Sequence, residues 1–250
     1  MDQIFLLGGH DLEMLTIREL LQLQNVSFFD KNLTWDNALL SAYAEELENY
    51  AVRDCLIVGV ELREDVVRPH NYVLIDHHND HSDCSSSLEQ VADLLGIELD
   101  RRQQLVAIND REYIDGLKLF GATEDEISKI RRADREAQGV MEAEELLAEK
   151  SVSGAVIRNG VTVVETNCSH FSPITDRMYP CSKLLIYNEE SLAYYGECCK
   201  KLVAHYQKEI AARRVYYGGG ERGFIGFNKA SFSKIEIENQ IEIIINIVGE

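Results

Sequence analysis

The stretch Tyr72-Val73-Leu74-Ile75-Asp76-His77-His78 joins a short apolar run to one acid and two histidines. A fully apolar run of this length is typical of a strand that is buried on both faces, as in a parallel sheet. Side chains that follow such a strand lie at the carboxyl edge of the sheet, where α/β proteins bind their ligands. The stretch therefore predicts both an α/β fold and the place of its functional site.

Three earlier apolar runs alternate with helical patterns. We expect strands at Ile4–Leu7, Val26–Phe29 and Leu56–Val60, with helices over Leu12–Gln24 and from an N-cap at Thr34 through Leu47. Alternation of strand and helix favours a parallel sheet. We therefore predict a parallel-sheet N-terminal domain with flanking helices over residues 1–145.

The middle of the chain, from Ser85 to about Lys150, has a helical pattern. Ser86 with Glu89, and Thr123 with Glu126, each have the spacing of a capping box at the start of a helix. Gly96 suits the end of the first of these helices. The basic residues of the second are interleaved with acids, so we expect an exposed, salt-bridged face there, formed by Lys129, Arg131, Arg132 and Arg135.

After Ser151 the pattern changes to hairpins, because Asn159-Gly160 is a strong turn signal. We expect a smaller α+β C-terminal domain over residues 152–250. Its predicted elements are strands at Ala155–Ile157 and Val161–Glu165, a helix from about Glu189 to Arg214, and two last strands at Lys234–Glu238 and Ile241–Val248.

The composition limits what the protein can bind. The 250 residues include 43 acidic and 25 basic side chains, for a formal net charge of −18. This charge disfavours long nucleic acid, whose binding depends on Lys and Arg, but a local metal or arginine site can still hold a few phosphates. The six cysteines include no C-x-x-C pair, which argues against structural zinc and against a disulfide framework. With no membrane-length apolar run and no basic leader, we expect a cytoplasmic protein.

Acidic and imidazole side chains follow three of the predicted strands. His10, Asp11 and Glu13 follow the first strand, Glu61 follows the third, and Asp76-His77-His78 follows the fourth. Carboxylates and imidazoles without thiolates suit Mn²⁺ or a similar divalent ion. One or two such ions can promote the hydrolysis of a phosphate ester, which is the reaction class that we favour. The alternative is that these are ordinary polar residues of loops.

Three segments together resemble the DHH phosphoesterase superfamily over about residues 1–140. These are Ile75-Asp76-His77-His78-Asn79, Ser86-Ser87-Leu88-Glu89-Gln90-Val91-Ala92 and Ala107-Ile108-Asn109-Asp110. More weakly, Gly218-Gly219-Gly220-Glu221-Arg222-Gly223-Phe224 is similar to the glycine-rich strip of the DHH-associated C-terminal domain. The resemblance implies a metal-dependent phosphohydrolase with two domains.

The resemblance also implies roles for single residues. His77 would be a metal ligand and His78 would face the substrate phosphate, while Asp76 would orient them. Glu61 takes the place of an acid that bridges the metals, and Asp110 matches the late aspartate of the family.

Four further residues are candidates for substrate binding, and one more for catalysis. We expect Gly218, Gly219, Gly220 and Arg222 to contact the substrate, because glycines admit close backbone approach. Arg111 has the planar fork that suits phosphate oxygens, although a surface pair with Glu112 explains it equally well.

Two departures from the family pattern leave the activity open. Family members commonly carry two aspartates where this chain has Met14 and Thr16, and its acids are Asp11 and Glu13 instead. Glu61 stands where the family has an aspartate. The site could therefore hold one metal instead of two, serve an unusual substrate, or have lost activity.

Our leading hypothesis is a Mn²⁺-dependent phosphoesterase that hydrolyses small nucleotide-type phosphodiesters or phosphomonoesters, such as short oligonucleotides, cyclic dinucleotides or bisphosphates. The acidic composition favours such small substrates over long nucleic acid, and no membrane partner is expected. The alternatives are a single-strand-specific exonuclease and a catalytically decayed nucleotide-binding protein. A homodimer is compatible with the sequence.

Overall fold

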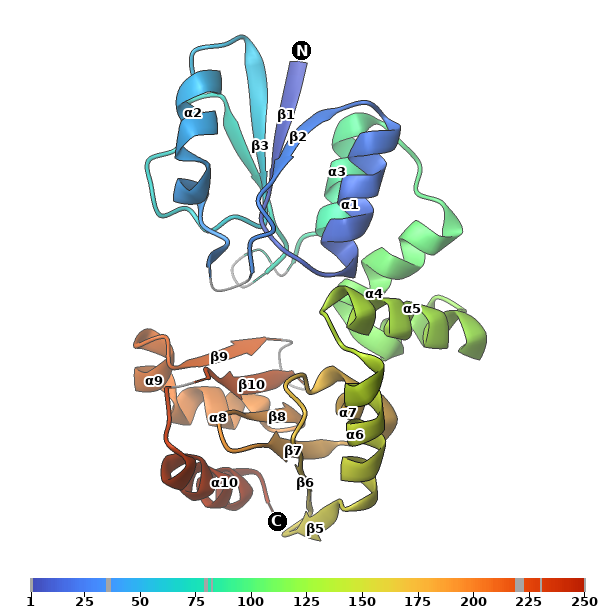
Figure 1. The fold of residues 1–250 in the computed structure, drawn as a ribbon, viewed down its shortest axis with the longest axis vertical. Coiled ribbons are helices and arrows are strands. Elements are labelled where there is room, and N and C mark those ends of the chain that lie inside the picture. Colours follow the sequence, from blue (N-terminus) through green and yellow to red (C-terminus); the bar gives the residue numbers. More distant parts are fainter. Residues whose placement is uncertain are drawn as a thin grey trace. The chain divides into compact units, whose positions relative to one another are not determined.

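The structure is a computed structural model that describes residues 2–34, 37–78, 81, 83–218, 223–229 and 231–249. It divides into two compact units, Met1–Gly139 and Val140–Glu250, and each unit has its own sheet (Figure 1). Among the described residues, no helix combines the length and the apolar character needed to cross a bilayer. The two units are described separately below.

The first unit is built on a four-stranded sheet with the order β2-β1-β3-β4. All three strand pairs are parallel, with Leu7 opposite Val60 and Val60 opposite Ile75, so the strands end at one common edge. The bounds are β1 Asp2–Leu7, β2 Ser27–Asp30, β3 Cys55–Val60 and β4 Tyr72–Ile75. The parallel α/β architecture predicted for this part of the chain is confirmed.

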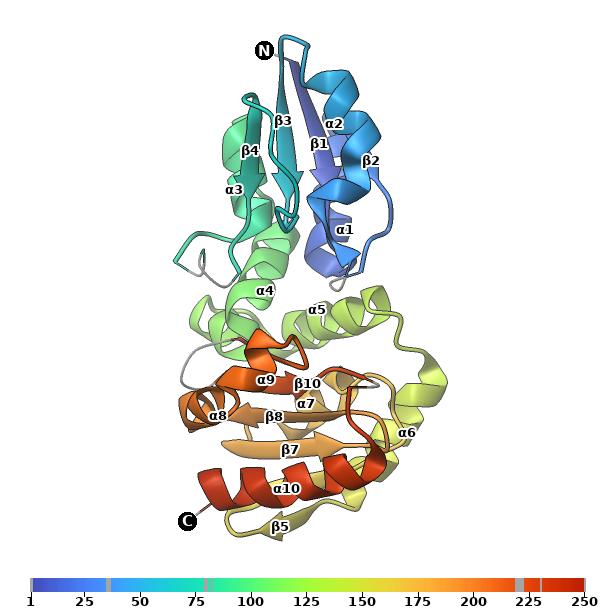
Figure 2. The ribbon, with the colours of Figure 1, turned by 90° about the vertical axis from the view of Figure 1, so that its left-hand side faces the viewer.

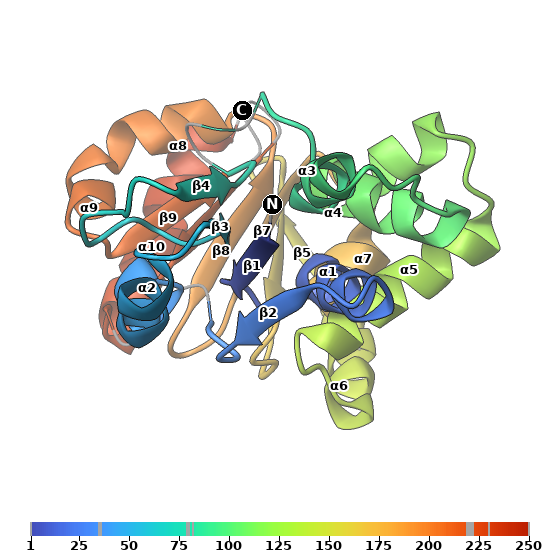
Figure 3. The same cartoon turned by 90° about the horizontal axis from the view of Figure 1, so that it is seen from above.

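Helices cover both faces of this sheet. The helix α2 lies on one face, and α1 and α3 lie on the other (Figures 1 and 3). On the α2 face, Tyr43 is buried against Leu6 and Ile57, and its hydroxyl donates a hydrogen bond of 2.6 Å to the carbonyl of Leu7. The bounds are α1 Leu12–Leu23, α2 Ala44–Tyr50, α3 Ser87–Leu95, α4 Arg101–Leu119 and α5 Glu124–Ala137.

Two of the three predicted N-cap residues are confirmed. Ser86 caps α3 and Thr123 caps α5, each in a complete capping box. Thr34 does not cap α2, and its backbone N–H and its hydroxyl both donate to the side chain of Asn37. The helical part begins later, with a 3₁₀ turn over Leu40–Tyr43 that leads into α2.

The expectation of an exposed basic face on α5 is wrong for Arg131. Arg131 and Asp134 are both buried, because they share one face of α5 with Ile127 and Ile130. Arg132 is exposed and pairs with Glu136, as the interleaved charges predict.

The second unit is built on a six-stranded mixed sheet with the order β5-β6-β7-β8-β10-β9. The pair β6·β7 is parallel and the other pairs are antiparallel. The predicted hairpin is confirmed, with Asn159 and Gly160 at positive φ between β5 and β6. The bounds are β5 Val156–Arg158, β6 Val161–Glu165, β7 Lys183–Tyr187, β8 Leu192–Gly196, β9 Val215–Gly218 and β10 Phe224–Phe227.

Five helices of the described chain complete the second unit (Figure 2). Two buried clusters define its core: one joins α8 and α10 to the sheet through Leu202 and Ile244, and the other joins α6 and α7 to it through Ala148 and Ile174. The bounds are α6 Glu142–Ser153, α7 Ser172–Met178, α8 Cys199–His205, α9 Gln207–Ala211 and α10 Lys234–Val248. This α+β arrangement agrees with the predicted fold class.

Two predicted elements of this unit are wrong. The predicted strands at Lys234–Glu238 and Ile241–Val248 form the single helix α10, which Ser233 and Glu236 open with a capping box. The predicted helix from Glu189 to Arg214 is instead the strand β8 followed by the short helices α8 and α9. In both cases the tertiary packing of an apolar face decides the element, because short apolar runs fit either period.

Candidate metal centre

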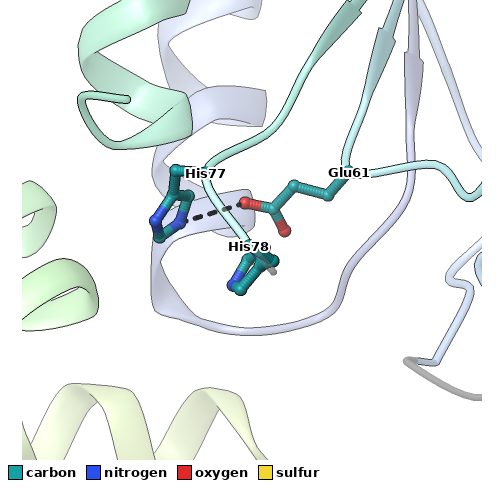
Figure 4. Close-up of side chains that lie close together, drawn as sticks. All are labelled: Glu61, His77 and His78. Carbon is teal, nitrogen blue, oxygen red and sulfur yellow. Dashed lines mark ion pairs between the residues drawn. The ribbon is translucent and has the colours of Figure 1, made fainter. Parts of the chain in front are cut away.

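Acids and an imidazole from four different elements meet at the carboxyl edge of the first sheet. Nε2 of His77, after β4, lies 2.8 Å from Oδ2 of Asp110 on α4. The same nitrogen lies 3.3 Å from Oε2 of Glu13 on α1 and 3.6 Å from Oε1 of Glu61 after β3. Figure 4 shows His77 facing Glu61, with His78 beside them. The structure thus brings together four of the predicted metal ligands.

Backbone geometry places the Glu61 side chain. Glu61 has a φ of 53°, in the left-handed region, and its N–H donates a hydrogen bond of 2.8 Å to the carbonyl of Ile75. The β1–α1 loop runs close to it: a Cβ at Gly8 would lie 2.5 Å from the carbonyl oxygens of Val60 and Glu61. Gly8 is therefore needed for the two loops to approach each other, a role that the sequence analysis missed.

Several atoms of the cluster are buried with no hydrogen-bond partner outside the cluster in the described part of the chain. They are Oε2 of Glu13, both carboxylate oxygens of Glu61, Nε2 of His77 and Oδ2 of Asp110. Buried polar atoms nearly always have hydrogen-bond partners. A group of carboxylate oxygens crowded around one imidazole nitrogen therefore needs a physical explanation. A divalent cation explains it, because oxygen and imidazole nitrogen are its natural ligands.

Two sets of three residues have the ligand spacing that an ion requires. One is Glu61, His77 and His78, and the other is Glu13, His77 and Asp110; within each set the ligand atoms lie within 4.8 Å of one another. His77 belongs to both sets. The side chains therefore fit one divalent ion.

The electrostatics of the cluster agree with this fit. Burial raises the pKa of Glu61 well above its ordinary value, and the nearby carboxylates of Asp11 and Glu13 raise it further. The pKa of Glu13 is raised by burial and by Asp110. Burial alone would lower the pKa of His77, but the carboxylates of Asp110 and Glu13 outweigh it and raise the pKa to about 10. The cluster therefore favours bound positive charge.

Asp76 fixes the orientation of His78. Oδ1 of Asp76 accepts the backbone N–H of His78 at 2.9 Å and lies 2.9 Å from Nδ1 of its ring. An imidazole that donates from Nδ1 keeps the lone pair on Nε2. Gln90 in turn holds the loop, because its side-chain amide donates to the carbonyls of Asp76 (3.0 Å) and Ser85 (2.7 Å).

Two other contacts support the acids. The backbone N–H of Leu88, in the first turn of α3, donates to Oε1 of Glu13 at 2.9 Å. Asn109, beside Asp110, accepts a hydrogen bond of 2.9 Å from the buried guanidinium of Arg131. The sequence analysis missed Leu88, Gln90 and Arg131 as supports. For Leu88 and Gln90 the signal was their position in a segment that carries the family resemblance, and for Arg131 it was the helical spacing from Ile127.

Other predicted site residues lie around the cluster or outside the described residues. His10 is exposed and belongs to neither set of ligands. Asp11 is buried, but its carboxylate accepts the N–H of Met14 at 2.8 Å as the N-cap of α1. Arg111 pairs with Glu89 and Glu112. Gly218 ends β9 in the second unit, whereas Gly219, Gly220 and Arg222 lie outside the described residues.

The architecture is that of DHH-domain proteins. A DHH-domain member of the s1p family of ribosomal proteins superposes with a TM-score of 0.54 at 13% sequence identity, over 98% of this chain and 87% of the other. RecJ from Thermus thermophilus, in complex with Mn²⁺, superposes with a TM-score of 0.51 at 12% identity, over 98% of this chain and 52% of RecJ. The chain therefore has the DHH fold, and the resemblance inferred from the sequence is confirmed at the level of the fold.

The superposition with a pGpG-specific phosphodiesterase from Vibrio cholerae covers 98% of each chain, with a TM-score of 0.48 and 11% sequence identity. No protein-family model matches the sequence, and the comparison with curated proteins gives no match.

Proposed function

We propose that this chain is a metal-dependent phosphoesterase whose site is the cluster around His77. The observation that carries the proposal is the group of buried potential ligand atoms that Glu13, Glu61, His77 and Asp110 bring close together. We propose that these residues bind a divalent ion. We propose Mn²⁺ as this ion, because RecJ in complex with Mn²⁺ has the same fold. For His10 and Asp11, the role of metal ligand stays a prediction.

When bound, a divalent ion polarises a phosphate ester and makes water a stronger nucleophile. The chain's own residues hold the substrate. Asp76 fixes the ring of His78 through Nδ1, and we assign the contact with the substrate phosphate to this ring. Arg111 supplies a second cation for the phosphate, and Glu89 and Glu112 hold its guanidinium in place at 2.8 Å and 2.6 Å.

The net charge of −18 supports a small substrate. A long polynucleotide needs many Lys and Arg contacts to its phosphates, whereas one or two phosphates need only the cation site. We therefore propose nucleotide-type phosphodiesters or phosphomonoesters: short oligonucleotides, cyclic dinucleotides or bisphosphates. Gly218, Gly219, Gly220 and Arg222 stay predicted substrate contacts.

One observation favours a second candidate, a nucleotide-binding protein that has lost catalysis. Met14 is buried, and the hydroxyl of Thr16 donates to the carbonyl of Leu12 at 2.7 Å. Neither position, where the family commonly has aspartates, offers a metal ligand. The helix α1 therefore contributes Glu13 alone to the ligand sets found among the described residues, which reduces the capacity of the site for a second ion.

The test is product formation from a panel of dinucleotides, short RNAs, cyclic dinucleotides, bisphosphates and long single-stranded DNA, each with Mn²⁺ or with EDTA. We expect Mn²⁺-dependent turnover of a small substrate that His77→Ala abolishes and His205→Ala preserves, since His205 is exposed on α8. Turnover of long DNA alone would favour the exonuclease. Nucleotide binding without Mn²⁺ binding or turnover would favour the decayed protein.

A further inference from the structure

The helix that carries Asp110 is broken close to it. Within α4, Tyr113 has φ 57° and ψ −149°, so the helical hydrogen bonding is interrupted three residues after Asp110. A Cβ at Gly116 would collide with the Cβ of Glu112, so the chain can fold back here only because residue 116 is glycine. The turn that presents Asp110 to His77 therefore lies at the end of a regular helix and needs support from another element.

That support comes from α5. Arg131 is buried with an exposed fraction of 7%, and its Nη1 donates to Oδ1 of Asn109 at 2.9 Å. Its guanidinium carbon lies 4.5 Å from the centre of the Tyr113 ring, a cation–π distance. One guanidinium thus contacts the residue directly before Asp110 and the residue at which the helix breaks.

The same Nη1 donates to Oδ2 of Asp134 at 2.8 Å. Gln138 also donates to this carboxylate oxygen, at 3.1 Å. A buried ion pair is weak support for stability, because desolvation of both charges offsets their attraction and apolar side chains would fill the space as well. The flat guanidinium, which can bridge a carboxylate, an amide oxygen and an aromatic ring at once, fits a role in geometry better.

We propose that Arg131 is a positioning residue: by contacting Asn109 and Tyr113, it holds the turn of α4 in the conformation that directs the Asp110 carboxylate at His77. This inference rests on the proposed metal-dependent function. In this scheme Arg131 acts on Asp110 through the side chains of Asn109 and Tyr113, which it contacts.

The experiment measures Mn²⁺ affinity by isothermal titration calorimetry, with thermal unfolding of the metal-free protein as the check on folding. The variants are Arg131→Met, Arg131→Lys and Asn109→Ala. The matched control is Arg132→Met, which removes a neighbouring arginine that is exposed and pairs with Glu136 on the same helix. Asn109→Ala leaves the Arg131–Asp134 pair in place, so it tests the inference even if Arg131→Met fails to fold.

We expect Arg131→Met and Asn109→Ala each to weaken Mn²⁺ binding by about 10–100-fold, the usual effect of removing a group that orients a metal ligand. Arg131→Lys keeps the charge beside Asp134 but cannot bridge both partners, so we expect it to restore stability without restoring affinity. The double variant should bind about as weakly as either single variant, because both changes break one contact.

Wild-type affinity in folded Asn109→Ala, or full rescue by Arg131→Lys, would overturn the positioning role and leave the proposed metal centre standing. A wild-type protein that binds no Mn²⁺ would overturn the proposed function, and this inference with it. Weakened binding in Arg132→Met as well would attribute the effect to the loss of positive charge on α5, again against a positioning role.

Discussion

Nε2 of His77 and Oδ2 of Asp110 lie 2.8 Å apart, and both atoms are buried. The two residues come from the loop after β4 and from α4, so the fold itself creates this contact. Oε2 of Glu13 lies 3.3 Å from the same nitrogen, so three potential ligand atoms lie close together. These atoms are of the kinds that a divalent ion prefers as ligands.

Arg111 is expected to act on the substrate and not on the metal. Its guanidinium is held by Glu89 and Glu112, outside both ligand sets. We expect Arg111→Ala to raise KM for the phosphate substrate by about 10–100-fold, which is the usual effect of losing a charge-assisted hydrogen bond. The affinity for Mn²⁺ should stay unchanged. Steady-state kinetics and calorimetry measure the two effects. Equal KM in Arg111→Ala and the exposed-site control Arg132→Ala would exclude the phosphate contact.

The stability of the metal-free protein should fall as the pH rises. The pKa of His77 is raised from 6.5 to about 10 in the folded protein. A raised pKa stabilises the fold fully below the unfolded pKa, and this stability is lost as the pH rises through the folded pKa. Asp11, Glu13 and Glu61 also have raised pKa values, so they act in the same direction.

We therefore expect the free energy of unfolding in EDTA to decrease from pH 6.5 toward pH 10, the window that the His77 pKa defines. Mn²⁺ displaces protons from its ligands, so its stabilising effect should grow with pH. Urea unfolding at several pH values, with EDTA or with Mn²⁺, measures both trends. His77→Ala is the comparison variant, and a slope as steep as that of the wild type would contradict the assignment to His77.

Removal of the Glu61 charge should stabilise the metal-free protein and impair metal binding. Burial and neighbouring carboxylates raise the pKa of Glu61, so its ionised form is costly in the folded state. We expect Glu61→Gln to raise the free energy of unfolding in EDTA by roughly 0.5–2 kcal/mol, the usual gain when a strained functional group is removed, and to lower Mn²⁺ affinity by at least about tenfold.

Denaturation in EDTA and calorimetry with Mn²⁺ test this pair of effects. Glu48→Gln is the matched control, because Glu48 is exposed on α2. A destabilised Glu61→Gln with normal affinity for Mn²⁺ would show that Glu61 has a purely structural role.

The sequence predicted the edge of the first sheet well, because strand ends and their acids are local features. The runs that end at Leu7, Val60 and Ile75 are apolar, and the acids and imidazoles follow within a few residues. The capping boxes at Ser86 and Thr123 are equally local. What the sequence did not show is which ligand atoms meet, since that depends on the left-handed backbone of Glu61.

The errors arose where two periodicities compete. Ile235 and Ile237 alternate with acids, which imitates a strand, yet Ile237, Ile241, Ile244 and Val248 lie on the buried face of the helix α10. The capping box of Ser233 and Glu236 was the available signal for that helix. The burial of Arg131 was visible only as its helical spacing from Ile127, because its partner Asn109 lies on another element.

Gly8 offers a test of how the two loops of the site fit together. A Cβ at this position would lie 2.5 Å from the carbonyl oxygens of Val60 and Glu61, and backbone atoms cannot move aside cheaply. We expect Gly8→Ala to lower the free energy of unfolding by about 1–3 kcal/mol, as for an overpacked core, and to weaken Mn²⁺ binding because Glu61 is displaced. At Gly154, by contrast, the nearest atom to an added Cβ is 3.5 Å away. The free energy of unfolding of Gly154→Ala should therefore stay within about 0.5 kcal/mol of the wild-type value. Chemical denaturation and Mn²⁺ titration of both variants measure these effects, and equal behaviour of the two would mean that the β1–α1 loop does not set the position of Glu61.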